Sequence, residues 1–61
     1  MQNKLLTAIC FDLDNKAYKY RRIQNNTRSL NNFESFARTK SIKYINYYDR
    51  DTKLFLRQQK L

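Results

Sequence analysis

Neither glycine nor proline occurs anywhere in the chain. Every reversal of the backbone must therefore be made by residues such as Asn, Asp and Ser, which tolerate left-handed conformations or bond to their own backbone. Two segments of this kind stand out, at Asp14-Asn15 and at residues 49–52, which read Asp-Arg-Asp-Thr. Because strand-like segments flank both, we expect two β-hairpins, one in each half of the chain.

The first turn predicts how its two strands pair. If Asp14 and Asn15 form the centre of a two-residue turn, one face of the hairpin is apolar and aromatic and the other is small and basic. The predicted pairs are Phe11–Tyr18 and Ile9–Tyr20 on the apolar face, and Cys10–Lys19 and Ala8–Arg21 on the basic face.

The second turn, at residues 49–52, predicts the same division between segments 42–48 and 53–59. The predicted pairs are Tyr47–Leu54 and Ile45–Leu56 on the core face, and Tyr44–Arg57 and Tyr48–Lys53 on the reverse face. Two independent turns that produce the same separation of apolar from basic residues favour hairpins over helices.

The segment between the hairpins has helical spacing. Apolar residues recur there at Leu30, Phe33, Phe36 and Ala37, and the candidate N-cap residues are Asn25, Asn26, Thr27 and Ser29. We expect a short helix over about residues 28–38, with Phe33 and Phe36 in the core rather than stacked on bases. The predicted fold is α+β, mainly β, with two antiparallel hairpins forming a small sheet and a short helix or irregular link between them, in one domain spanning residues 1–61.

The charge of the chain is one-sided. Its 61 residues contain 13 Lys and Arg against 5 Asp and Glu, which gives a formal net charge of +8 and predicts a polyanionic partner. A basic surface that is merely solvated is the alternative, although solubility alone rarely requires so strong an imbalance. Basic and aromatic residues alternate in segments 18–22 and 43–48, a pattern that suits phosphate contacts and base stacking. The candidate RNA-binding residues are Lys16, Lys19, Arg21, Arg22, Arg28, Arg38, Lys40, Lys43 and Arg57, with Tyr18 and Tyr44 as stacking residues.

The sequence offers little for catalysis. It has no His, and its sole cysteine, Cys10, can form neither an intrachain disulfide nor a Cys/His zinc site, so we expect a small, partly buried apolar residue there. The neighbouring carboxylates Asp12 with Asp14, and Asp49 with Asp51, fall in predicted turns, where such residues usually shape the loop. We therefore expect no enzymatic activity, no metal or other cofactor and no small-molecule substrate. No apolar run approaches the roughly 20 residues that span a bilayer, so no membrane partner is expected.

The order of these segments resembles the bacterial-type large-subunit ribosomal protein thirty-three, in the zinc-less form of some bacteria and mitochondria. The similar segments are residues 5–10, the turn at Asp14-Asn15, residues 17–22, Ile42 to Ile45, Tyr48-Asp49, Lys53 and residues 54–56. Both turns depart from the family: the first lacks glycine, and in the second Arg50 stands where proline normally follows the Asp. Segment 26–40 also looks longer than the corresponding link.

The resemblance implies a structural constituent of the ribosomal large subunit that binds ribosomal RNA and touches neighbouring ribosomal proteins. An abundance of residues with AT-rich codons favours a mitochondrial or other organellar ribosome, with a cytoplasmic location as the alternative. A second hypothesis is a small phage or plasmid DNA-binding regulator, which would need a recognition helix or a β-ribbon in a two-fold dimer. A third is a subunit of a protein assembly that adds strands at the hairpin edges, which would leave the charge unexplained.

Overall fold

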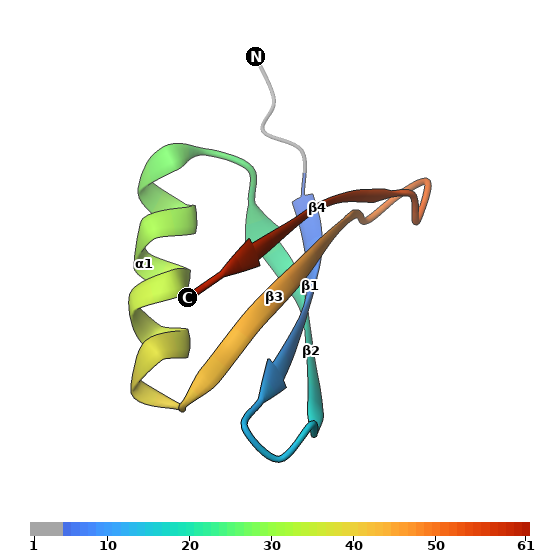
Figure 1. The fold of residues 1–61 in the computed structure, drawn as a ribbon. Helices are drawn as coiled ribbons and strands as arrows, with labels where there is room; N and C mark the ends of the chain where they lie inside the picture. The colour runs from blue at the N-terminus through green and yellow to red at the C-terminus, as the bar shows by residue number, and fades with distance from the viewer. Residues whose placement is uncertain (1–4) are drawn as a thin grey trace.

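Four strands and one helix make up the fold. The computed structural model describes residues 5–61, so the first four residues of the predicted domain 1–61 lie outside the described part of the chain. The elements are β1 (Leu5–Asp12), β2 (Ala17–Gln24), α1 (Thr27–Thr39), β3 (Ile42–Asp49) and β4 (Phe55–Lys60) (Figure 1). The predicted fold, two antiparallel hairpins in one small sheet with a short helix between them, is confirmed.

The sheet has the strand order β2-β1-β3-β4, and every neighbouring pair is antiparallel. The first strands of the two hairpins, β1 and β3, therefore pair with each other at the centre, and the second strands form the edges. Helix α1 lies against one face of this sheet (Figure 1). The result is a two-layer molecule whose other sheet face is not covered by the helix.

The core lies between α1 and the sheet. Alternate residues of the two central strands point into it, as the period of two in a half-buried strand requires. The buried residues are Leu6, Ala8, Cys10, Phe33, Ala37, Ile42, Ile45 and Tyr47. Cys10 is more deeply buried than expected, and burial raises the pKa of its thiol to about 11, so the group remains protonated near neutral pH.

The first hairpin has a longer loop than the sequence suggested. The N–H of Asp12 donates to the carbonyl of Lys16 (3.1 Å), which leaves three loop residues, and the last of them, Asn15, has φ 64°. This is the three-residue loop in which a turn is followed by a left-handed residue. Oδ1 of Asp12 accepts bonds from the N–H groups of Asp14 (2.8 Å) and Lys16 (2.9 Å), which hold the loop closed. The Lys16 N–H, more than any other group, lowers the pKa of Asp12.

The extra loop residue makes the predicted pairing of the first hairpin wrong by one position. The observed pairs are Phe11–Ala17, Cys10–Tyr18, Ile9–Lys19 and Ala8–Tyr20. A slip of one residue exchanges the two faces of a strand. Ala8 and Cys10 therefore lie in the core, while Ile9 and Phe11 lie on the uncovered face beside Lys19.

The second hairpin has the predicted four-residue loop, displaced by one residue. The N–H of Asp49 donates to the carbonyl of Leu54 (2.9 Å), and a bulge in β4 shifts the pairing further. The observed pairs are Tyr48–Phe55, Tyr47–Arg57, Asn46–Gln58, Ile45–Gln59 and Tyr44–Lys60. Burial of Ile45 and Tyr47 is confirmed. Burial of Leu54 and Leu56 was predicted wrongly, since they are 65% and 49% exposed.

Helix α1 extends one residue beyond the predicted range at each end. Oδ1 of its N-cap residue, Asn26, accepts a bond from the N–H of Ser29 (2.8 Å), as in a regular N-cap. Phe33 is buried as predicted. Phe36 is 42% exposed and lies at the rim of the core, where its ring meets that of Tyr20 edge-on at 5.9 Å between centroids. Its predicted place in the core was wrong.

A polar contact ties α1 to the second hairpin. The buried hydroxyl of Tyr47 donates to Oε2 of Glu34 (2.9 Å), and the guanidinium of Arg57 lies 4.8 Å from the centre of the Tyr47 ring and 4.0 Å from the same carboxylate. Burial first, and then the Glu34 carboxylate, raise the pKa of Tyr47, so its hydroxyl stays a donor. We call these three residues the Tyr47 cluster.

Candidate nucleic-acid interface

The sheet face opposite α1, called the open face below, carries the residues that alternate with the core positions. Cross-strand pairing places them side by side, because paired residues project to the same face. The open face consists of Thr7, Ile9 and Phe11 from β1, Lys19 and Arg21 from β2, Tyr44, Asn46 and Tyr48 from β3, and Phe55, Gln58 and Lys60 from β4.

Aromatic rings stand at both ends of β3 on the open face. Phe11 and Tyr44 are stacked, with ring centroids 4.8 Å apart and planes inclined by 23°. At the other end, Tyr48 and Phe55 meet edge-on at 5.5 Å. Between the two pairs, Nε2 of Gln58 donates to Oδ1 of Asn46 (3.0 Å). The open face therefore carries aromatic rings at two places, separated by an amide pair.

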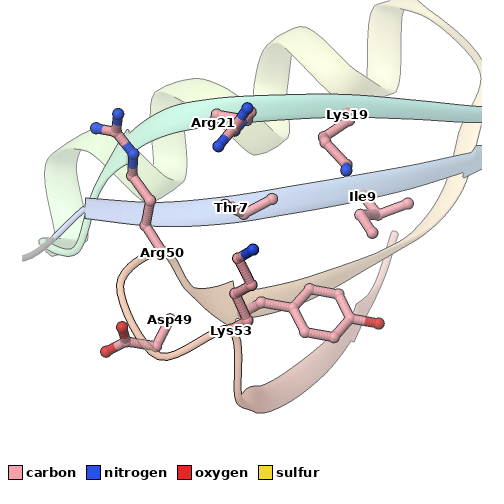
Figure 2. Close-up of a pocket in the computed structure, with 8 residues that line it drawn as sticks. Thr7, Ile9, Lys19, Arg21, Asp49, Arg50 and Lys53 are labelled. Carbon is pink, nitrogen blue, oxygen red and sulfur yellow. The ribbon is translucent and has the colours of Figure 1, made fainter.

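Beside the second aromatic pair lies a shallow hollow of about 310 Å³, which we call the cationic hollow. Its lining residues are Thr7, Ile9, Lys19, Arg21, Tyr48, Asp49, Arg50 and Lys53. Figure 2 shows the cationic side chains arranged around Thr7 and Ile9 on β1, with α1 on the far side of the sheet. The described lining thus combines four cations and one carboxylate with a small, partly apolar floor.

The loop after β3 positions two of these cations. The N–H of Arg50 donates to the carbonyl of Leu5 (3.3 Å), and the backbone of Lys53 is left-handed, with φ 64°. Oδ1 of Asp49 accepts bonds from the N–H groups of Asp51 (2.8 Å) and Thr52 (2.9 Å), so this carboxylate shapes the loop. The loop folds back towards the start of β1 and brings its cations opposite those of β2.

Another cation lies at the far end of the open face. Nζ of Lys43 donates to Oδ1 of Asn15 in the first loop (2.6 Å) and lies 5.7 Å from the centre of the Tyr44 ring. Within residues 5–61, the ion pair that forms, Arg57 with Glu34, belongs to the helix side of the sheet. The lining of the cationic hollow carries more positive than negative side chains, which favours an anion there.

Other kinds of site receive no support from the described residues. Within residues 5–61, no three His, Cys, Asp or Glu side chains are grouped so that they could hold a metal ion. The one helix in that range is too short and too polar to cross a membrane.

No family model, curated protein or solved structure matches the chain. The open face itself is therefore the basis for assigning a function.

The structure divides the predicted RNA-binding residues between the two sides of the sheet. Lys19, Arg21 and Tyr44 lie on the open face, and Lys43 lies beside Tyr44. Arg22 is exposed on β2, and Lys16 is exposed between the first loop and β2. The other five are Arg28 and Arg38 on α1, Lys40 at its C-cap, Arg57 in the Tyr47 cluster and Tyr18.

Tyr18 lies on the helix side of the sheet. It lines a second hollow with Tyr20, Lys40 and Ile42. Its hydroxyl donates to Oδ2 of Asp12 (3.2 Å), and this bond is the main cause that raises the pKa of Tyr18. The residue thus belongs to a different surface from the cationic hollow.

Sequence reasoning missed several residues of the open face. Arg50 and Lys53 were not among the predicted binding residues, because they fall in a loop whose path the sequence does not reveal. Phe11 was missed because the predicted register placed it in the core. The available signal was that Thr7, Ile9 and Phe11 alternate on β1 with a second largely apolar set, Leu6, Ala8 and Cys10, so either set could have faced the core.

Proposed function

We propose that this chain binds RNA through the open face. The observation that carries the proposal is that the cationic hollow adjoins solvent-accessible aromatic rings on the one sheet face that α1 leaves uncovered. Cations hold phosphates and thereby position a nucleic acid, and aromatic side chains on a sheet stack on its bases. Binding rather than catalysis is the proposed role, and the bonds by which Asp12 and Asp49 shape their loops are consistent with it.

The position of α1 argues against a helix-based DNA regulator. The helix packs its apolar stripe on the sheet face opposite the cationic hollow. A nucleic acid held by the hollow would therefore lie away from the helix, which could not enter a major groove at the same time. Double-stranded DNA serves as a competitor in the binding experiments.

The resemblance to ribosomal protein thirty-three suggests a specific form of this proposal. In that form the chain is a structural constituent of the large subunit of an organellar ribosome, where the open face contacts ribosomal RNA and the remaining surface touches neighbouring ribosomal proteins. Helix α1 occupies most of segment 26–40, which is longer than the family's link. Sucrose-gradient fractionation after a high-salt wash tests this, because a constituent stays with the large subunits and a free pool contradicts the placement.

Removing charge from the open face should weaken RNA binding. We expect the triple variant Lys19→Gln, Arg21→Gln, Lys53→Gln to lose orders of magnitude in affinity for a mixed-sequence RNA. The slope of log affinity against log salt should fall by roughly 0.7 to 0.9 for each phosphate that the variant no longer binds. Fluorescence anisotropy at several salt concentrations measures both quantities.

The matched control removes the same charge from the helix side. The triple variant Arg28→Gln, Arg38→Gln, Lys40→Gln changes the net charge equally but leaves the cationic hollow intact. It should keep a nearly wild-type salt slope. If both triple variants lose affinity and slope to the same extent, net charge alone drives binding and the proposed interface is wrong.

A further inference from the structure

The Tyr48–Phe55 pair leaves ring surface on which a base can stack only if it is unpaired. Because Tyr48 and Phe55 meet edge-on, neither covers the face of the other completely, and Phe55 is 57% exposed. The faces of a base inside a duplex are already stacked on its neighbours. Bases that stack on protein side chains therefore come from single strands, loops or bulges.

The spacing of the pairs also disfavours a stacked helix. Tyr44 and Tyr48 are four residues apart on β3, a separation of about 13 Å at the usual rise of a strand. Neighbouring nucleotides of a stacked strand are only about 3.4 Å apart along the helix axis. Two neighbouring bases of a regular helix are therefore too close together to reach both aromatic pairs. A strand that is extended, with its bases splayed apart, can place one base at each pair.

Tyr48 connects the aromatic and the cationic parts of the open face. Its side chain lines the cationic hollow and also forms the edge-on pair with Phe55. A phosphate among Lys19, Arg21 and Lys53 would thus lie next to a surface for a base, with Ile9 and Thr7 available for the ribose. The open face thus offers one nucleotide three adjoining contacts: cations for its phosphate, small side chains for its ribose and an aromatic pair for its base.

From these observations we infer that the open face binds single-stranded RNA and selects it over duplex. One unpaired nucleotide places its phosphate in the cationic hollow and its base on the Tyr48–Phe55 pair, and a second unpaired base stacks at the Phe11–Tyr44 pair. The inference rests on the proposed function and adds to it the kind of RNA that is bound. The amide pair of Asn46 and Gln58 lies between the two bases and can bond to the intervening backbone.

The test compares an RNA oligonucleotide, the same strand in a perfect duplex, and a version of the strand with abasic positions. The wild-type chain should bind the single strand at least about ten-fold more tightly than the abasic version, because stacking supplies affinity that phosphates do not. It should also bind the single strand more tightly than the duplex. Equal affinity for all three would overturn the inference.

Protein variants locate the stacking surface. The variant Phe55→Leu, and the double variant with Tyr48→Leu, should lower single-strand affinity by roughly ten-fold or more while leaving abasic RNA binding unchanged. Leucine keeps apolar bulk, and the exposed Phe55 can be replaced with little risk to folding, which circular dichroism checks. Tyr18→Leu is the matched control, since Tyr18 is a 42% exposed aromatic residue on the helix side. It should bind like the wild type.

The outcomes separate this inference from the proposed function. If the Gln variants of the cationic hollow weaken binding but the Leu variants do not, the open face binds RNA through phosphates alone and the selection of unpaired bases is wrong. If the wild-type chain binds none of the three RNAs, the proposed function itself is wrong. Loss of affinity in Tyr18→Leu equal to that in Phe55→Leu would also overturn the inference.

Discussion

Ile45 and Leu56 occupy very different environments, although the sequence-based register paired them on one buried face. The side chain of Ile45 is fully buried between the sheet and α1, whereas Leu56 lies at a bulge in the edge strand and is about half exposed. Burial, and not residue type, decides what a charge costs at each position.

Replacing these residues by Asp should therefore have unequal effects. Ile45→Asp puts an unpaired charge into the core, which costs several kcal/mol and should unfold so small a domain. Leu56→Asp should remain folded, with a change of less than about 1 kcal/mol in the free energy of unfolding. Urea unfolding followed by circular dichroism measures both. Unfolding of Leu56→Asp would show that β4 is packed differently.

At the scale of elements, the Tyr47 cluster joins helix to sheet. The variant Glu34→Ala leaves the buried hydroxyl of Tyr47 without its acceptor, which should lower the free energy of unfolding by about 1 to 3 kcal/mol. In a Tyr47→Phe background the same substitution should cost clearly less, because the donor is gone. Urea denaturation of the wild type, the two single variants and the double variant gives the coupling energy between Glu34 and Tyr47. Additive losses would mean that the hydrogen bond contributes nothing measurable.

The elements differ in how well the sequence predicted them. Helix α1 was placed within one residue at each end, because its apolar spacing and its Asn26 cap are local signals. Both hairpins were placed, but their registers were not, because register depends on which residue adopts the left-handed conformation. Asn15 was assigned to a two-residue turn and closes a three-residue loop instead, and nothing in the sequence marks Lys53 for positive φ.

The candidate site could be predicted only in part for the same reason, because the registers of the hairpins were not predicted. A basic, aromatic strand surface follows from composition and alternation, and three of the residues predicted to bind RNA, Lys19, Arg21 and Tyr44, lie together on the open face. Which residues belong to the site depends on the register of the strands, since a one-residue slip moves Phe11 from the core to the open face. Arg57 illustrates the reverse case, because the bulge in β4 turns it towards Glu34.

For the whole molecule, salt should act in opposite directions on the free and the bound protein. A net charge of +8 on 61 residues makes the folded chain repel itself. Raising the ionic strength from about 0.01 M to 0.15 M shortens the screening length from about 30 Å to about 8 Å, so the thermal midpoint of the free protein should rise. The stabilisation by added RNA should shrink over the same range, because phosphate contacts weaken.

Circular dichroism melts with and without single-stranded RNA at the two ionic strengths provide the measurement. The two midpoints should converge as salt increases. A free protein whose midpoint falls with salt would indicate that attractive charge pairs, rather than repulsion, dominate its electrostatics.

The left-handed residues Asn15, Ser41 and Lys53 have a consequence for the unfolded chain. Glycine is the residue that most enlarges the set of conformations open to a disordered backbone, and this chain contains none. Its denatured ensemble is therefore narrower than that of the same chain with glycine at these three positions, so folding loses less backbone entropy. The cost in free energy appears instead as local backbone strain at these three residues of positive φ. A glycine at any of these positions would release the strain but widen the denatured ensemble. Part of the stability of this small domain therefore comes from the restricted conformations of its unfolded chain.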